Sequence, residues 1–292
     1  MLNGKVLLSS QPDEQALFDK LRKIKLIALD MDGTLYRGST VFPYTYKFLA
    51  DLKEMGIRYC FLTNNPSRSN SDYISHLRHL GIFATSEEVY TSGQATINYL
   101  KRLHPSIRRL FILGTPSMIS EFESSGFESV ANDPDEVPEA VVVGFDTSLV
   151  YDRLARAAWW VAKGKLFVAT NPDLVCPTDQ RTLLIDCGSI CAAIERSTGR
   201  KPDVVLGKPQ PEMLNSFLEM YNLQSDEVAM VGDRIYTDIE MARRTDSFGV
   251  LVLSGEATKQ DALEAIPVPD LVTPSIATFG EMLQLSRVGQ LR

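Results

Sequence analysis

The sequence predicts an α/β fold built on a parallel β-sheet, and two features of its residue pattern lead to that prediction. Short apolar runs typical of buried strands alternate with longer stretches of helical periodicity, an order that favours βαβ units. Several of these runs end on Asp, Asn, Gly or Thr. Because ligands bind beyond the carboxyl ends of the strands in such sheets, we expect the polar endings of three of these strands to converge on one crevice.

The expected elements follow from this pattern. The strand candidates are residues 25–32, 57–65, 109–115, 140–146, 165–173, 227–233 and 248–255. The helix candidates with the clearest spacing are residues 44–56, 151–164 and 211–222. In the first of these helices, Phe48, Leu49 and Leu52 recur at the spacing of one helix face before a glycine that marks the end.

Size and composition indicate a globular protein. The chain has 292 residues, of which 44% are hydrophobic and 23% are charged, which suits one large domain or two smaller ones. Its net charge of −7 disfavours a general binder of nucleic acids or anionic membranes, because such a protein needs a basic surface. No apolar run approaches the roughly 18–20 residues of a membrane span.

The N-terminal stretch lacks the apolar core and cleavage site of a secretory signal. The four cysteines, Cys60, Cys176, Cys187 and Cys191, form no CxxC pair and no metal-ligand spacing. We therefore expect a protein of the reducing cytoplasm. The amphipathic segment of residues 13–24 is either a packing helix or part of a flexible leader.

The domain organisation is less distinct in the pattern. Acidic and polar strand ends cluster near residues 30, 63 and 233. Residues 94–188, between them, have a β and α pattern of their own. This stretch either continues the sheet or forms an inserted domain, and the pattern alone is compatible with both.

The stretch LIALDMDGTLYRG, residues 26–38, ends a buried strand on two acids. Carboxylates are costly to bury unless a cation meets them. Asp30 and Asp32 are two positions apart, so they share one face of a strand, and Gly33 and Thr34 favour a tight turn behind them. An acid in this place can bind a metal, act as a base or attack an electrophile, although Asp32 alone is also typical of an ordinary Asp-Gly turn.

Three further strand ends carry polar residues that suit a phosphate or metal site. Thr63 and Asn64 follow an apolar run, and hydroxyls and loop amides donate to phosphate oxygens, although such residues also cap helices. Lys208 follows a strand and a glycine, where it either reaches the same crevice or is a solvated surface lysine. Asp233 ends a strand, and Asp238 follows five residues later at the start of a helix.

Together, Asp30, Asp32, Asp233 and Asp238 would place at least four carboxylates in one site. Such a cluster requires a cation, and Mg²⁺ is a hard ion that prefers oxygen ligands. The chain has neither a GxxxxGK[ST] loop nor a GxGxxG loop after a strand, which disfavours a kinase or a nicotinamide enzyme of the usual kind.

The order of DMDGTLYRG, LTNN, GKP and GDRIYTD along the chain resembles the haloacid dehalogenase (HAD) superfamily of phosphohydrolases. The spacing is similar to that of its NagD-like, 4-nitrophenylphosphatase-type branch, which has a large C2-type cap between the second and third motifs. The resemblance covers about residues 24–280. It implies a Rossmann-like parallel-sheet core of residues 1–93 and 189–292, with a mobile α/β cap inserted as residues 94–188.

The resemblance also implies a role for each motif residue. Asp30 would attack phosphorus to form an aspartyl-phosphate, and Asp32 would protonate the leaving alkoxide and then activate water. Thr63 and the Asn64 amide would hold the phosphoryl oxygens. Lys208 would neutralise charge on the nucleophile and the phosphate, as phosphoryl transfer requires.

The implied cofactor is Mg²⁺. It would be held by Asp30, the Asp32 carbonyl and Asp233, with Asp238 orienting Lys208 or a water on the metal. A carboxyl at position 32 favours oxygen leaving groups, because it can serve as proton donor and then as acceptor.

In the cap, Asn171 and Asp173 end a strand in a loop that by resemblance faces the core and the substrate. The alternative is that this loop is an ordinary Asn-Pro turn.

The activity that the resemblance implies is that of a Mg²⁺-dependent phosphomonoesterase acting on a small phosphorylated metabolite. By resemblance, candidate classes are nucleoside monophosphates, sugar or glycerol phosphates, phosphoglycolate and pyridoxal phosphate. A phosphotransferase or phosphomutase and a non-catalytic phosphate-binding protein are the alternatives, and a homodimer formed through the cap is left open.

Overall fold

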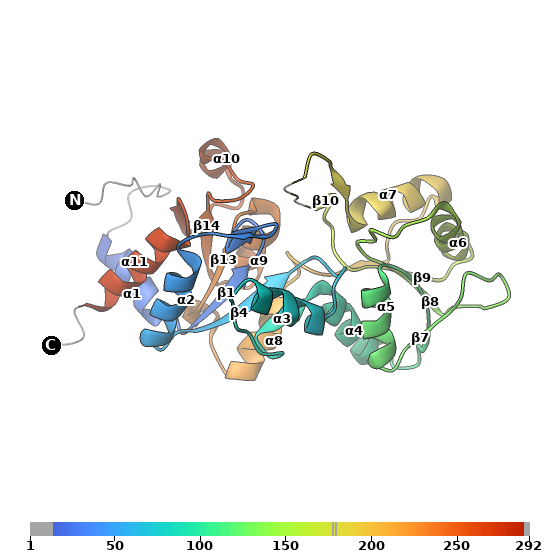
Figure 1. Cartoon of the computed structure of the whole chain (residues 1–292), viewed down its shortest axis with the longest axis horizontal. Coiled ribbons are helices and arrows are strands. Elements are labelled where there is room, and N and C mark those ends of the chain that lie inside the picture. Colours follow the sequence, from blue (N-terminus) through green and yellow to red (C-terminus); the bar gives the residue numbers. More distant parts are fainter. Residues whose placement is uncertain (1–13, 177, 179, 289–292) are drawn as a thin grey trace. The chain divides into compact units, whose positions relative to one another are not determined.

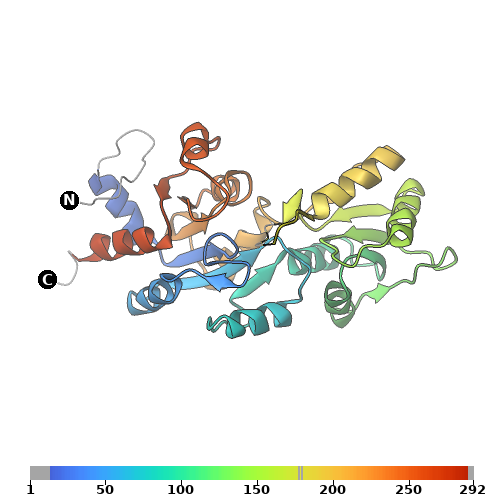
Figure 2. The same cartoon turned by 45° about the horizontal axis from the view of Figure 1, so that its top comes forward.

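The computed structural model describes residues 14–176, 178 and 180–288, and it consists of two compact units (Figures 1 and 2). The first unit comprises Met1–Leu62 and Pro209–Arg292, and the second comprises Thr63–Lys208. The predicted cap, residues 94–188, lies within the second unit, and its limits stay a prediction. The first 13 residues, for which the sequence predicts no secretory signal, lie outside the described residues.

The first unit is built on a parallel sheet in which β1 occupies the point where the strand order reverses. The strands run in the order β15 (Leu271–Thr273), β14 (Phe248–Val252), β13 (Val228–Gly232), β1 (Leu26–Asp30) and β4 (Arg58–Thr63). All of these neighbours are parallel. The chain passes from β1 to β4 on one side, whereas β13 and the strands after it add on the other side. In open parallel sheets such a reversal positions a binding crevice at the carboxyl ends.

Three helices of the first unit pack together: α1 (Glu14–Lys23), α2 (Thr45–Glu54) and α11 (Ile276–Arg287). Helices α1 and α11 lie side by side in both views (Figures 1 and 2). Leu17 and Leu21 of α1 are buried, and Arg287 Nη2 donates to the carbonyl of Ile24 at 3.0 Å. Over its described part, the amphipathic segment of residues 13–24 is therefore a packing helix.

Several further elements belong to the first unit. They are β2 (Tyr36–Arg37), β3 (Thr40–Val41), α8 (Glu212–Tyr221), the 3₁₀ turn η1 (Ser225–Glu227), the π-helical turn η2 (Ile235–Ile239), α9 (Glu240–Arg244) and α10 (Lys259–Glu264). Strands β2 and β3 form an antiparallel hairpin directly after β1.

The second unit has a parallel sheet of its own with helices on both faces. Its strands run in the order β12 (Val204–Val205), β9 (Leu166–Ala169), β8 (Ala140–Val143), β6 (Arg109–Leu113) and β7 (Glu128–Ser129). Successive side chains of a strand point to opposite faces. Phe111 packs in a cluster with residues of α6 (Tyr151–Ala162) and α7 (Cys187–Thr198), whereas Ile112 packs with residues of α4 (Ser92–Leu103) and α5 (Pro116–Ser124).

The other elements of the second unit are α3 (Asn70–His79), β5 (Val89–Thr91), β10 (Val175–Cys176) and β11 (Leu184–Ile185). Strands β10 and β11 pair as an antiparallel hairpin. The predicted α/β class with a parallel-sheet core is confirmed. None of the helices in the described part of the chain is long and apolar enough to cross a membrane.

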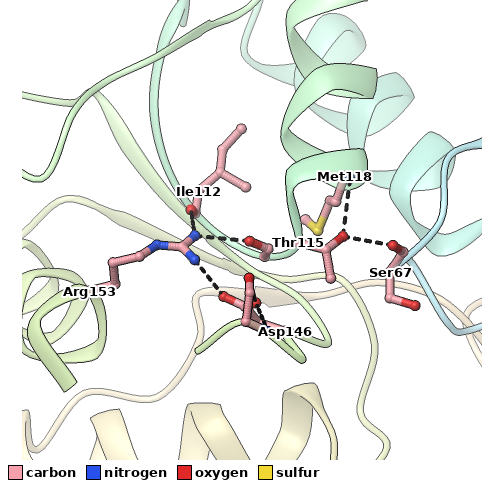
Figure 3. Close-up of polar contacts among 8 residues, drawn as sticks. Ser67, Ile112, Thr115, Met118, Asp146 and Arg153 are labelled. Carbon is pink, nitrogen blue, oxygen red and sulfur yellow. Dashed lines mark hydrogen bonds and ion pairs between the residues drawn. The ribbon is translucent and has the colours of Figure 1, made fainter. Parts of the chain in front are cut away.

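A buried ion pair fixes the carboxyl ends of β6 and β8 (Figure 3). The Asp146 side chain is 0% exposed, and the Arg153 side chain of α6, 21% exposed, donates to it at 2.9 Å. The second arm of Arg153 donates to the carbonyls of Ile112 at 3.0 Å and Gly114 at 2.9 Å, and Ser148 donates to Asp146 through its amide and its hydroxyl. The pair therefore ties a helix to two strand ends.

We expect Arg153→Met to destabilise the second unit by about 3 kcal/mol, because it leaves Asp146 as an uncompensated buried charge. The double variant Asp146→Leu/Arg153→Met should lose less than the sum of the two single changes. Glu128→Gln, which removes an exposed partner of Arg109, is the control and should change stability by less than about 1 kcal/mol. Chemical denaturation measures the free energy of unfolding of the unaltered protein, of Asp146→Leu and of the three variants above. Equal losses for Arg153→Met and Glu128→Gln would contradict the prediction.

Candidate active site

Two predicted acids lie at the carboxyl ends of neighbouring parallel strands. Leu29 pairs with Val231 across β1 and β13. Asp30 is the last residue of β1 and Asp233 directly follows the last residue of β13. Because the strands are adjacent and parallel, their C-terminal residues emerge at the same edge of the sheet.

Asp238 joins these two acids from the turn η2. The Arg234 amide donates to Asp238 Oδ2 at 3.1 Å, and the Asp238 amide donates to the Arg234 carbonyl at 3.1 Å. One carboxylate oxygen each from Asp30, Asp233 and Asp238 lies within 4.8 Å of the others. Asp233 is 2% exposed and Asp238 is 0% exposed. The structure thus brings together three of the four predicted carboxylates; the predicted ligand atom of Asp32 is its carbonyl oxygen.

Glycines allow the backbone to approach these carboxylates closely. A Cβ on Gly33, whose φ is +91°, would lie 2.4 Å from Asp233 Oδ2. A Cβ on Gly255 would lie 1.9 Å from the same oxygen. Gly232 likewise leaves room for Asp238, because a Cβ on Gly232 would lie 2.2 Å from Asp238 Cγ. Larger residues at these positions would displace the acids.

The electrostatics of Asp233 indicate that it needs a cation. Its Oδ2 accepts from the Glu256 amide at 2.6 Å, whereas its buried Oδ1 has no hydrogen-bond partner among the described residues. Burial, followed by the charges of Asp30 and Asp238, raises the pKa of Asp233 well above its usual value. An oxygen-preferring divalent ion would satisfy the Oδ1 atom and offset the repulsion among the three acids. The residues present therefore fit a hard metal ion.

Asp32 has the electrostatics of a proton carrier. Burial, and next the charge of Asp30, raises its pKa to about 6, against an opposing hydrogen bond from Gly38 and the charges of Arg234 and Arg37. A carboxyl with a pKa near neutrality can give up a proton and take one back at similar pH.

We expect Gly33→Ala to lower, by about 100-fold, the phosphatase activity that the sequence predicts, because the added Cβ must displace the Asp233 carboxylate and small displacements in a catalytic site have large effects on rate. The positive φ alone costs about 1–2 kcal/mol for a residue with a Cβ. Gly164→Ala is the matched control, since Gly164 has φ +84° but nothing within 4 Å of a Cβ. Steady-state rates and unfolding midpoints of both variants check this expectation, and equal activity in the two would contradict it.

A second group of predicted residues meets around Asn64, in the second unit. Asn64 Nδ2 donates to both carboxylate oxygens of Asp173 at 3.3 Å each and to the Lys208 carbonyl at 3.0 Å. The Lys208 amide donates to Asn64 Oδ1 at 2.6 Å. Asn171 Nδ2 donates to the Asn64 carbonyl at 2.7 Å. Thr63, the last residue of β4, accepts a hydrogen bond on its hydroxyl from the Asn65 amide at 3.1 Å.

Sequence reasoning missed the segment that supports Asp233. Besides the Glu256 amide, the Ala257 amide donates to the Asp233 carbonyl at 3.1 Å, and Ser254 Oγ donates to the Gly33 carbonyl at 2.7 Å. These residues follow β14, which the sequence predicts to end in Ser-Gly. The available signal was that a polar, glycine-containing stretch follows a strand at the same edge of the sheet.

Comparison with known proteins identifies the family of this chain. A family model described as haloacid dehalogenase-like hydrolase matches residues 27–128, and one described as HAD-hydrolase-like matches residues 205–279. The ribonucleotide monophosphatase NagD of Escherichia coli (strain K12) is 33% identical over 255 residues, covering 87% of this chain and 97% of the relative. This chain belongs to the haloacid dehalogenase-like hydrolases. The predicted superfamily is thereby confirmed.

Solved structures place this HAD-like hydrolase in the predicted branch. The crystal structure of a 4-nitrophenylphosphatase from Thermotoga maritima matches with a TM-score of 0.83 at 40% identity, covering 90% of this chain and 98% of that one. A glycerol phosphate phosphatase from Mycobacterium tuberculosis, solved in complex with magnesium, matches with a TM-score of 0.82 at 31% identity, covering 91% and 79%. The prediction of a phosphatase in the NagD-like, 4-nitrophenylphosphatase-type branch is confirmed.

Proposed function

We propose that this phosphatase hydrolyses a small phosphate monoester with Mg²⁺ through an aspartyl-phosphate on Asp30. The observation that carries the proposal is the cluster of Asp30, Asp233 and Asp238, in which the buried Asp233 Oδ1 has no hydrogen-bond partner within the part of the chain that the structure describes. Such a set of oxygens suits Mg²⁺, and a relative in the same family is solved with magnesium. When bound by these acids and the Asp32 carbonyl, the ion would neutralise charge on the phosphoryl group.

In the first step, a carboxylate oxygen of Asp30 forms a bond to phosphorus as the bond from phosphorus to the ester oxygen breaks. Asp32 gives its proton to the departing alkoxide, which leaves as an alcohol. In the second step, Asp32 takes a proton from water as the water oxygen attacks phosphorus. Inorganic phosphate leaves and the Asp30 carboxylate is regenerated. The pKa of Asp32, raised to about 6, suits both proton transfers.

Thr63, the Asn64 backbone amide and Lys208 would hold the phosphoryl oxygens and offset their charge, and Asp238 would orient Lys208 or a water. The side-chain amide of Asn64 is hydrogen-bonded to Asp173 and Lys208, so a phosphate contact by Asn64 falls to its backbone N–H. Asn171 and Asp173 stay predictions as substrate contacts.

The named relatives support a proposal for the substrate class. Named relatives act on ribonucleotide monophosphates, 4-nitrophenyl phosphate and glycerol phosphate. We propose a small metabolite of this kind, selected by the predicted cap of residues 94–188, whose closure would exclude water. We propose that the protein acts in the cytoplasm, since its four cysteines form no CxxC pair and fit a reducing compartment. A homodimer through the cap stays a prediction that sedimentation would test.

The test is phosphate release from a panel of ribonucleoside monophosphates, sugar phosphates, phosphoglycolate, pyridoxal phosphate, glycerol phosphate and 4-nitrophenyl phosphate. Each ester is assayed with Mg²⁺ and with EDTA. We expect release that depends on the metal. Turnover only when a second alcohol is present would instead favour a phosphotransferase or phosphomutase. A folded protein that binds phosphate but releases none from any ester would favour the non-catalytic binder.

A further inference from the structure

The side chain of Asn64 makes a two-way hydrogen-bond pair with the backbone of Lys208. The Lys208 amide donates to Asn64 Oδ1 at 2.6 Å, and Asn64 Nδ2 donates to the Lys208 carbonyl at 3.0 Å. Both residues are buried, with Asn64 6% and Lys208 2% exposed. A primary amide bound to both polar groups of one residue restrains that residue's backbone more than a single bond does, because the peptide units on both sides of its Cα are held.

Asp173 fixes which way this amide points. Its carboxylate, 5% exposed, can only accept while ionised, so the nitrogen of Asn64 must face it. The Lys208 backbone N–H can only donate, so the side-chain oxygen of Asn64 must face that N–H. The two neighbours together exclude the flipped amide. A flipped side chain would place two acceptors together at Asp173 and two donors together at Lys208.

The surrounding chain leaves Asn64 little room to move. Its carbonyl accepts from Ser92 Oγ at 2.6 Å and from Asn171 Nδ2 at 2.7 Å. Gly207, at φ +72°, precedes Lys208, and a Cβ there would lie 2.7 Å from Asn64 Oδ1. A glycine is therefore needed for the Lys208 backbone to reach the amide. The arrangement is tight and internally satisfied, which is the condition for a buried polar network to specify one geometry.

We propose that Asn64 is a positioning residue for Lys208, and that Asp173 acts through Asn64 by orienting its amide. This inference rests on the proposed reaction, in which the Lys208 ammonium offsets charge on the phosphoryl group. It gives the Asn64 side chain a function apart from holding phosphate. It also gives the buried carboxylate of Asp173 a function apart from touching substrate. Small displacements of a charged group at a phosphoryl-transfer site have large effects on rate.

The test is a double-mutant cycle between Asn64→Asp and Lys208→Ala. Asn64→Asp keeps an acceptor for the Lys208 amide but removes the donor to Asp173 and to the Lys208 carbonyl. We expect it to lower kcat on 4-nitrophenyl phosphate about 10- to 100-fold and to weaken inhibition by inorganic phosphate. In the Lys208→Ala background, the same change should alter both quantities less than about 2-fold, since the lysine it positions is gone.

The readouts separate positioning from mere structural support. The dissociation constant of inorganic phosphate, measured by calorimetry in all four proteins, completes the cycle even where turnover is too slow to follow. Asn98→Asp, which changes an asparagine of α4 that donates to the Tyr90 hydroxyl, is the matched control and should leave both quantities unchanged. Equal effects of Asn64→Asp with and without Lys208, or no effect at all, would overturn the inference. If Asn64→Asp does not fold, Asn64→Ser enters the same cycle.

A conservative change at Asp173 gives an independent check. Asp173→Asn keeps an oxygen that can accept from Asn64 Nδ2 and should retain kcat within about 3-fold, whereas Asp173→Leu should approach the loss seen for Asn64→Asp. Equal losses for the two Asp173 variants would overturn the orienting role. If Lys208→Ala itself keeps full activity, the proposed role of Lys208 fails. If that variant is impaired but the cycle is additive, only the positioning inference fails.

Discussion

We expect Asp30→Asn to lower turnover by about 10⁴-fold or more while the protein stays folded, in the range seen when a covalent nucleophile is removed. The asparagine amide has nearly the shape of the carboxylate but cannot attack phosphorus as an anion. Asp30 lies at the end of β1, and one of its carboxylate oxygens is within 4.8 Å of a carboxylate oxygen of Asp233 and one of Asp238. Removing one negative charge from that group reduces its repulsion, so the fold has no reason to weaken.

Two measurements check this expectation. The first is kcat on 4-nitrophenyl phosphate beside the control Asp246→Asn, which changes an exposed acid at φ 53°, a conformation that asparagine tolerates well. The second is mass spectrometry of enzyme quenched during turnover, which should find phosphate on a peptide containing Asp30. Normal activity in Asp30→Asn, or phosphate on another residue, would refute the covalent mechanism through Asp30.

The acid cluster could be predicted in part because hydrophobic pattern and strand order act together. A buried run that stops on Asp30 and another that stops before Asp233 are visible in the sequence, and parallel strands send their ends to one edge. The sequence alone could not show that β1 and β13 are neighbours, because pairing is set by tertiary packing. Nor could it show the π-helical turn that aims Asp238 back at Asp233.

Contacts between buried polar side chains and backbone were harder to predict. Asn64 follows a strand, which is typical of a phosphate contact or a helix cap, yet its amide pairs with the backbone of Lys208, distant in sequence. Arg153 has the position of a solvated helix residue, but Asp146 is buried beside it. Both cases depend on which segments the fold brings together, and a residue's type and local spacing carry no information about that.

The short strands show the same limit at the level of secondary structure. Strands β7 and β12 have two residues each, too few to display the alternation that identifies a strand. They pair at the two edges of the second unit's sheet, where backbone pairing with the longer neighbouring strands holds them extended. The seven predicted strands were longer apolar runs, and their pattern was strong enough to indicate a strand without knowledge of the neighbouring strands.

We expect removal of Mg²⁺ to abolish phosphatase activity and to lower the unfolding midpoint of the first unit. An ion at 100 times its dissociation constant stabilises the folded state by about 2.7 kcal/mol, which corresponds to roughly 5–10 °C for a unit of this size. Asp233→Asn should eliminate this response, because Asp233 Oδ1, which has no hydrogen-bond partner among residues 14–176, 178 and 180–288, is the oxygen that we expect to bind the ion. Thermal denaturation with Mg²⁺ and with EDTA measures the shift, with Asp246→Asn as control.

In EDTA the same substitution should have the opposite effect on stability. An asparagine at 233 keeps an oxygen for the Glu256 amide and presents NH₂ donors to Asp30 and Asp238, so metal-free Asp233→Asn should melt at a higher temperature than the unaltered protein. The raised pKa of Asp233 means that the folded state binds its proton more tightly than the unfolded state, whose carboxyl has a pKa of about 3.9. Stability of the metal-free protein should therefore fall as pH rises above that value, and the variant should show a smaller slope. If Asp233→Asn melts at a lower temperature than the unaltered protein in EDTA and is still stabilised by Mg²⁺, then Asp233 neither destabilises the metal-free protein by charge repulsion nor binds the metal.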